Sequence, residues 1–305
     1  MSILATPPPH QRIWTYSEIL RRLLLLKKLG SFKFFSYGKS GEGHKLWATR
    51  FGTGDKRVML CCRQHGTEYT STHAMVYLMN AMANHPEQYA DIFQALDIII
   101  IPVYNPDGAL YYDWVRQHGV RWHYKIMGMF NLTTGRTLSK MARDPNRDHR
   151  KQRWPETRAF AKLMEDFQPH LFLDLHNFGF SSNLYTTRPS HFKRDCMCPL
   201  VVDSPTVSKD LCKQCIRIAN VMRDAITQVG LYPAKINQLY PWPFDSTLRN
   251  INCAQNYYLE KKGIPSITVE VLGDFGMGDI FYDQSVPANL LAVLSVLRAM
   301  AAGKI

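Results

Sequence analysis

The sequence predicts an α/β fold in which helices cover both faces of one central sheet. Short apolar runs, each about the length of a buried strand, alternate along the chain with longer stretches of helical periodicity. The short runs carry apolar side chains at almost every position, as expected of strands that are buried on both faces. The two patterns together are typical of a sheet packed between helices.

The predicted elements follow in order along the chain. A capping box of Thr15 and Glu18 begins a helix through a leucine-rich stretch to Leu29, and Gly30 ends it. Strands are predicted at residues 57–62, 97–103, 171–175 and 266–271. Further helices are predicted at residues 70–83, 155–166, 209–228 and 287–301.

The length and composition of the chain allow a stable globular fold. Its 305 residues are 46% hydrophobic and 20% charged, and a chain of this length buries roughly three quarters of its unfolded surface. No internal repeat and no long linker divides it. We therefore expect a single domain over residues 1–305, with residues 1–30 as a helical lead-in and a cysteine-containing insertion at about residues 190–215.

Charge and targeting signals limit the expected partners and location. Lys and Arg number 37 against 25 Asp and Glu, a net charge of +12, which favours anionic partners in general. No zinc-finger spacing, RNA-binding signature or long basic helix accompanies this charge, so no nucleic acid is expected. The aliphatic runs are far shorter than the roughly 20 residues of a membrane helix, so no membrane insertion is expected. The first residues do not resemble a secretory signal, and a cytoplasmic location is expected.

Histidine and glutamate side chains lie at the ends of three predicted strands. His65 and Glu68 come directly after residues 57–62, His176 follows residues 171–175, and Glu270 lies near the end of the last strand. The carboxyl ends of parallel strands meet at one edge of a sheet, so these side chains are expected to lie together. Imidazoles and a carboxylate suit zinc, and three protein ligands leave a position for water, as in catalytic sites.

Each of these residues has a plainer interpretation when it is taken alone. A His-x-x-Glu spacing such as that of His65 and Glu68 is a weak signal. His176 could be a hydrogen-bonded histidine at a strand end, and Glu270 could pair with a nearby cation. Burying an unpaired carboxylate costs several kcal/mol, so some positive charge is required there, and a metal ion would supply it.

Five short motifs, taken in order, resemble the zinc metallocarboxypeptidases of the carboxypeptidase A-like type. They are His65-Gly66-Thr67-Glu68, Asn105-Pro106-Asp107-Gly108, Asp144-Pro145-Asn146-Arg147, Asp174-Leu175-His176 and Thr268-Val269-Glu270. The resemblance spans roughly residues 38–301 and is closest to a cytosolic or bacterial-type member. It implies a three-layer α/β/α sandwich with a mixed central sheet. It also implies hydrolysis of the C-terminal amide bond of a peptide or peptide-like substrate that has a free carboxylate.

The resemblance implies a role for each site residue. His65, Glu68 and His176 would hold one catalytic zinc ion, with water as the remaining ligand, and Glu270 would act as general base. Outside the ligands, Asp144 would orient a ligand histidine. Asn146 and Arg147 would bind the free α-carboxylate of the substrate, since a guanidinium makes a two-pronged match to a carboxylate.

Two features of the family have no unique match in this sequence. The arginine that stabilises the developing oxyanion should lie between the Asn-Pro-Asp-Gly and Asn-Arg motifs, where Arg121 is preferred to Arg116. For the mobile substrate tyrosine, Leu248 stands at the simple offset, and the nearby candidates are Tyr240, Tyr257 and Tyr258.

The cysteines suggest a second, structural zinc ion as a further hypothesis. Cys196 and Cys198, followed by Cys212 and Cys215, have a paired spacing similar to that of a four-thiolate site. The alternative is that the second pair packs in the core of a helical segment while the first pair lies in a loop.

Two other functions stay open at this point. An N-acyl amino acid deacylase on the related zinc scaffold would also need to recognise a carboxylate. A non-catalytic zinc-binding protein would keep the ligands without turnover. The positive net charge is compatible with an acidic substrate.

Overall fold

The computed structural model describes residues 13–29, 32–117, 144–178, 195–202, 205–233, 237–238, 253–272 and 282–305. The helices are α1 (Tyr16–Lys27), α2 (Tyr69–Asn84), α3 (Ala90–Ala95), α4 (Pro106–Gln117), α7 (Pro155–Phe167), α8 (Lys209–Gln228), α10 (Ala254–Lys262) and α11 (Tyr282–Ala301), with the short 3-10 helices η2 (Pro86–Tyr89) and η3 (Pro145–Arg147). The strands are β1 (Lys33–Lys39), β2 (Lys45–Phe51), β3 (Lys56–Cys62), β4 (Leu96–Ile101), β5 (Leu171–Phe178), β6 (Asp195–Val201), β7 (Tyr232–Pro233), β8 (Asn237–Gln238) and β9 (Ser266–Leu272).

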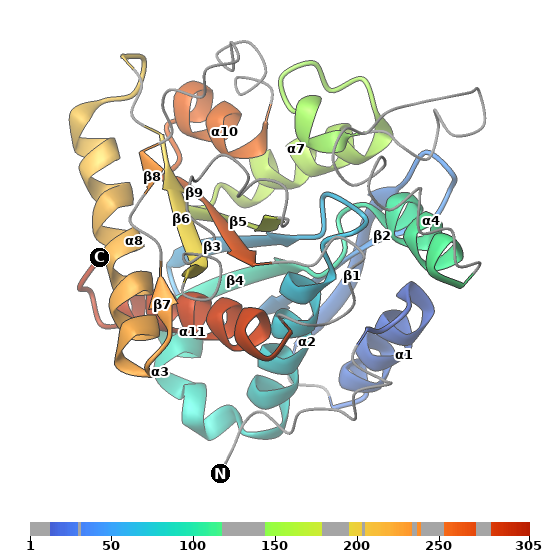
Figure 1. The fold of residues 1–305 in the computed structure, drawn as a ribbon, viewed down its shortest axis with the longest axis horizontal. Helices are drawn as coiled ribbons and strands as arrows, with labels where there is room; N and C mark the ends of the chain where they lie inside the picture. Colours follow the sequence, from blue (N-terminus) through green and yellow to red (C-terminus); the bar gives the residue numbers. More distant parts are fainter. Residues whose placement is uncertain are drawn as a thin grey trace.

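The strands of the described part form one mixed sheet. Their order is β1-β2-β4-β3-β5-β9-β6-β7, with β8 paired to β6. The centre is parallel, from β4 through β3 and β5 to β9, while β1, β2 and β6 each have an antiparallel neighbour. Figure 1 shows the sheet at the centre of the molecule with helices on both sides. The predicted α/β/α sandwich with a mixed sheet is confirmed.

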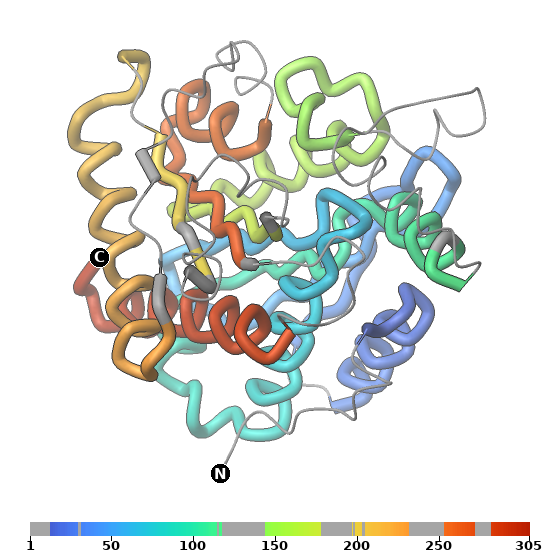
Figure 2. Tube along the Cα trace, in the orientation of Figure 1, coloured from blue at the N-terminus to red at the C-terminus, as the bar shows by residue number. Residues whose placement is uncertain are grey.

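Alternate side chains of the central strands pack against opposite layers of helices. On β3, Val58 and Leu60 contribute to a large core with α1, α2, α8 and α11. Met59 and Cys61 point the other way, into a smaller core with α7 and α10. Because side chains alternate between the two faces of a strand, burial on both faces explains the continuous apolar runs. The trace in Figure 2 follows these strands between the two helical layers.

Most of the predicted elements are present, with small shifts at their ends. The Thr15 hydroxyl accepts from the backbone N–H of Glu18, and the Glu18 carboxylate accepts from that of Thr15, so the capping box that begins α1 is confirmed. The predicted strands correspond to β3, β4, β5 and β9, and α8 has the predicted bounds. The last helix begins five residues before Pro287, which lies inside α11.

The prediction omitted β1, β2, β6, α3, α4 and α10, and also the two-residue strands β7 and β8. The side chains of β1 range from buried to exposed without a clear alternation, so the strand carries little sequence signal. The Asn-Pro-Asp-Gly motif is a turn sequence, but here it begins a helix. Pro106 occupies the first position of α4, where its missing N–H costs nothing, and the Asn105 side chain accepts from the N–H of Gly108, 2.8 Å away.

Helix α11 is the one described helix that is long and apolar enough to cross a membrane. However, 67% of its most apolar stretch is buried inside this fold. It packs against α2 and α8 in the larger core. Its apolar composition is therefore explained by its place in the core.

The loop between β3 and α2 lies directly against the start of α4. A Cβ atom on Gly66 would lie 2.2 Å from the backbone carbonyl of Gly108, so only glycine fits this approach. Asn105, which directly precedes α4, donates from its side-chain amide to the carbonyl of Gln64 over 3.1 Å. Arg63, whose φ of 56° is unusual for a residue with a side chain, donates from Nε to the carbonyl of Gly66 over 2.9 Å. These contacts fix the loop that follows β3.

We predict that Gly66→Ala destabilises the protein. The added methyl group would overlap with backbone rather than with a flexible side chain, and overpacking of this kind costs about 1–3 kcal/mol. Urea denaturation measures the change in the free energy of unfolding. Gly43→Ala is the control, because at φ 86° with no atom within 4 Å it introduces backbone strain without a clash. Wild-type stability of Gly66→Ala would contradict the close approach.

Candidate metal centre

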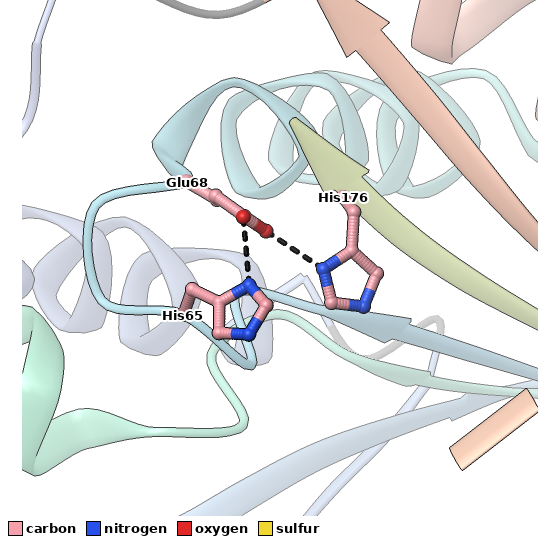
Figure 3. A group of neighbouring side chains, drawn as sticks. All are labelled: His65, Glu68 and His176. Carbon is pink, nitrogen blue, oxygen red and sulfur yellow. Dashed lines mark hydrogen bonds and ion pairs between the residues drawn. The ribbon is translucent and has the colours of Figure 1, made fainter. Parts of the chain in front are cut away.

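Three titratable side chains meet at the carboxyl edge of the sheet. His65 and Glu68 come from the loop after β3, and His176 comes from the neighbouring parallel strand β5. Their ligand atoms all lie within 4.8 Å of one another. Within the described ranges this is the one group of three or more His, Cys, Asp or Glu side chains that could hold a metal ion. Figure 3 shows the three side chains turned toward one another.

Glu68 lies between the two imidazoles. Its Oε1 is 2.7 Å from Nδ1 of His65, and its Oε2 is 2.8 Å from Nδ1 of His176 (Figure 3). Two imidazole nitrogens and a carboxylate are a donor set that zinc prefers, and three protein ligands leave a fourth position for water. The residues present therefore fit a catalytic zinc ion.

The ionisation of these groups shows that the cluster attracts positive charge. Burial disfavours the charged form of His65, but the carboxylates of Glu68 and Asp144 outweigh it and raise the pKa of His65 to about 10. Burial also opposes charge on Glu68, yet the two histidines lower the pKa of Glu68 to about 2. A divalent ion at this place would replace the protons that the imidazoles otherwise hold.

Each imidazole has another carboxylate on its far side. Nε2 of His65 lies 3.2 Å from Oδ1 of Asp144, and Nε2 of His176 lies 3.0 Å from Oδ2 of Asp174. Such contacts set which ring nitrogen carries the hydrogen and hold the ring in place. The structure thus places Asp144 against His65, one of the three candidate ligands. Asp174 had no role in the sequence analysis, although its position two residues before His176 on a strand puts both side chains on one face.

Glu270 stands beside His176 on the next strand. The two residues are partners in the register of the parallel pair β5 and β9, so their side chains point to the same face. Oε2 of Glu270 is buried and has no hydrogen-bond partner among the described residues. Burial raises the pKa of Glu270 to about 7, opposed by His176 and supported by Glu68. A carboxyl group with this pKa can accept or donate a proton near neutral pH.

The predicted carboxylate-binding residues lie on η3. Asn146 is buried, and its Oδ1 accepts from the N–H of Ala254 over 2.9 Å, while its Nδ2 lies 3.4 Å from Nε2 of His176. Arg147 is 44% exposed, with Nη1 3.1 Å from the Asn146 carbonyl and Nε 3.9 Å from Asp144. Arg147 therefore presents an accessible positive charge beside the cluster, whereas Asn146 ties η3 to the start of α10.

The structure bears less on the arginine and tyrosine candidates. Arg121 lies outside the described residues. Arg116 lies on α4, where its guanidinium stacks over the ring of Tyr112. Tyr258 is buried in the smaller core, so it cannot be the mobile tyrosine in this position. The Tyr257 hydroxyl lies 3.5 Å from the side-chain amide of Gln152, and Tyr240 and Leu248 lie outside the described residues.

The hypothesis of a second, structural zinc ion is not supported. Cys196 and Cys198 lie in strand β6 rather than in a loop, and their side chains are outside the described part. Cys212 and Cys215 are buried on the core-facing side of α8 and form no disulfide, and Sγ of Cys215 lies 3.9 Å from the Ser266 carbonyl. Packing in the core accounts for this second pair.

Comparisons of sequence connect this chain to one family. A family model described as zinc carboxypeptidase matches residues 28–195, more than half of the chain. Carboxypeptidase 2 of Trichophyton rubrum is 30% identical over 122 residues, which cover 40% of this chain and 18% of that protein. The match thus spans about a fifth of the length of the curated relatives.

Solved structures share the fold at lower identity. A metallo-carboxypeptidase from Burkholderia cenocepacia aligns over 95% of this chain and 70% of its own, with a TM-score of 0.67 and 16% identity. Bovine thrombin-activatable fibrinolysis inhibitor, solved in complex with a tick carboxypeptidase inhibitor, aligns over 96% and 99% respectively, with a TM-score of 0.69 and 14% identity. The family model ends at residue 195, before the strand that carries Glu270.

We predict that the metal-free cluster stabilises the fold most between pH 4.5 and 6.5 and progressively less as the pH rises through 10. Because the pKa of His65 rises from 6.5 to about 10 on folding, its stabilisation is complete below pH 6.5 and is lost as the pH rises through 10. Glu68 has the opposite sign, since its pKa falls from 4.5 to about 2, so its contribution is present above pH 4.5 and is lost toward pH 2.

The measurement is the melting temperature of wild type minus that of His65→Ala, followed over pH in the presence of a chelator. This difference should be largest between pH 4.5 and 6.5. Zinc should reverse the alkaline trend, because it competes with protons for the same nitrogen atoms. A difference that grows with alkaline pH in the chelated protein would contradict the assigned interactions.

Proposed function

The chain belongs to the zinc carboxypeptidase family, and we propose that it is a metallocarboxypeptidase that hydrolyses the C-terminal amide bond of a peptide or peptide-like substrate. One observation carries the proposal. His65, Glu68 and His176 converge at the edge of the sheet, and the buried, unpartnered carboxylate oxygen of Glu270 lies on the strand beside them. That arrangement combines a metal donor set with a separate group that can take a proton.

In this proposal His65, Glu68 and His176 hold the zinc ion. When bound, zinc lowers the pKa of a water ligand to about 7, which supplies a nucleophile for amide hydrolysis at neutral pH. The two histidines would offer Nδ1 to the ion, because those atoms face Glu68. Asp144 accepts from Nε2 of His65, and the carboxylate of Asp174 lies 3.0 Å from Nε2 of His176, so both rings stay oriented.

Glu270 acts as the general base of the reaction. Its Oε2 has no competing partner among the described residues, and burial increases its affinity for a proton. It takes a proton from the attacking water and passes it to the departing amine. Because water attacks the amide directly and Glu270 only transfers protons, the reaction requires no covalent intermediate between substrate and enzyme.

Arg147 binds the free carboxylate of the terminal residue. Its guanidinium is accessible to solvent. Arg147 lies on the short helix η3, and the residue before it on that helix, Asn146, contacts His176. A positive charge beside the metal centre favours substrates whose scissile bond is next to a free carboxylate. Asn146 supports this site by holding η3 against α10, and Arg121 stays our candidate for stabilising the developing oxyanion.

The first test of this function is the requirement for a free C-terminus. Zinc-loaded protein should release single residues from the C-terminus of unblocked peptides and leave C-terminally amidated peptides intact, as read by mass spectrometry. Arg147→Ala should lower kcat/KM for unblocked peptides about 10- to 100-fold, because a charge-assisted hydrogen bond is worth about 1.5–3 kcal/mol. Lys162→Ala, which removes one exposed positive charge from α7, is the matched control and should be unaffected.

Other outcomes of that assay would replace the proposal. Consumption of N-acyl amino acids while peptides survive would indicate the deacylase alternative. Absence of any hydrolysis by protein that retains zinc would indicate a non-catalytic zinc-binding protein.

The second prediction separates the base from the metal ligands. Glu270→Gln should lower kcat by about 10²- to 10⁴-fold, because it removes the proton acceptor, while zinc content stays at the wild-type level, because no ligand is lost. Steady-state kinetics and elemental analysis measure the two quantities on one preparation. His176→Ala is the contrasting variant, since it should lose both zinc and activity. Wild-type turnover by Glu270→Gln would show that another group takes the proton.

A further inference from the structure

A chain of buried polar side chains leads away from His176 into the protein. Nε2 of His176 lies 3.0 Å from Oδ2 of Asp174, whose Oδ1 accepts from the side-chain amide of Gln64 over 2.7 Å. Oε1 of Gln64 lies 2.9 Å from Nε2 of His149. All four residues are at most 1% exposed, so water does not compete with these contacts.

The chemistry of these groups sets the direction of the two hydrogen bonds that the side chain of Gln64 makes. A carboxylate only accepts, so Gln64 must turn its NH2 group toward Asp174 and its oxygen toward His149. His149 must then carry its hydrogen on Nε2. Its Nδ1 has no partner among the described residues, which suits an unprotonated nitrogen. Burial lowers the pKa of His149 to about 4, in agreement with a neutral ring.

At the other end of this series of polar side chains, aromatic rings pack around His149. The imidazole of His149 lies 5.8 Å from the ring of Tyr104, 5.7 Å from that of Phe160 and 5.9 Å from that of Tyr258, measured between ring centroids. These contacts hold His149 in place. A rigid donor at this end fixes the amide of Gln64, which in turn fixes the carboxylate of Asp174.

At its inner end, this series of polar side chains sets which ring nitrogen of His176 carries the hydrogen. Nδ1 of His176 faces Glu68, so with that atom on a metal ion Nε2 would carry the hydrogen, and the carboxylate of Asp174 lies 3.0 Å away to receive it. The side-chain amide nitrogen of Asn146 lies 3.4 Å from the same atom, but as a donor it cannot accept that hydrogen. The carboxylate therefore decides which nitrogen is protonated and which is free to bind a metal.

We propose that Gln64 is a positioning residue for the metal centre, acting with Asp174 and His149 to orient His176. Gln64 directly precedes His65 in the chain, while its side chain reaches the residue two positions before His176, so it links the two histidine-bearing segments. The inference rests on the proposed function, because it takes both histidines as zinc ligands. Loss of an outer contact of this kind typically lowers metal affinity or activity about 10- to 100-fold.

The test measures zinc affinity by competition with a chromogenic chelator, on protein stripped of metal. Gln64→Met keeps the length of the side chain but cannot donate to Asp174, and its dissociation constant for zinc should rise about 10- to 100-fold. His149→Phe should cause a smaller rise, because Gln64 keeps its bond to Asp174 and the new ring fits among the aromatic neighbours. The visible spectrum of the cobalt-substituted protein should change in Gln64→Met, since the geometry of His176 changes.

Thr268→Val is the matched control. Thr268 is the register partner of Asp174 on β9, and its hydroxyl donates to Gln255 over 2.7 Å, away from the chain to His176. The variant loses one buried hydrogen bond at the same level of the sheet, so it should lower the melting temperature and leave zinc affinity unchanged. Circular dichroism verifies that each variant is folded.

The outcomes distinguish the inference from the function beneath it. Unchanged zinc affinity and an unchanged cobalt spectrum in both Gln64→Met and His149→Phe would overturn the positioning role and leave the proposed function standing. An equal loss of affinity in Thr268→Val would also overturn it, because the effect would then be general destabilisation. A wild-type protein that binds no zinc would overturn the proposed function, and this inference with it.

Discussion

The carboxylate of Glu68, buried between two imidazoles, is the interaction on which the rest of the site depends. A buried carboxylate is costly unless positive charge balances it. Here the balance comes from His65 and His176, which belong to different segments of the chain. Either protons or a metal ion must supply that charge, so the packing at this edge of the sheet and the capacity to bind a cation have the same physical origin.

The parallel strands convert this local requirement into a defined geometry. β3, β5 and β9 are neighbours, and all three run in the same direction. Their carboxyl ends therefore bring His176, Glu270 and the loop after β3 that carries His65 and Glu68, here called the ligand loop, to one edge of the sheet. Register matters as much as order, since a slip of one residue between β5 and β9 would turn Glu270 to the opposite face.

The ligand loop is held from two sides by different kinds of contact. On one side, the backbone of Gly66 packs directly on that of Gly108, which leaves no space for a side chain. On the other, Gln64 donates a buried hydrogen bond to Asp174, whose second carboxylate oxygen lies 3.0 Å from Nε2 of His176. Close packing sets where the loop lies, and directional bonds set how the imidazoles are turned. A metal site needs its ligand side chains both in the right place and at the right angle, and these two kinds of contact supply the two requirements.

The sequence by itself determined the types of most buried elements and pointed to the candidate metal donors. Periodicity, capping boxes and the residues that follow a strand are local properties, which is why α8 and the cap at Thr15 could be predicted. Strands β1 and β2 and the helix that begins at Pro106 were missed, because their local pattern is ambiguous. Only the tertiary structure decided that the side chains of Gln64, His149 and Asp174 are connected by hydrogen bonds. Contacts between residues so far apart depend on how whole segments pack, and no spacing along the sequence encodes that.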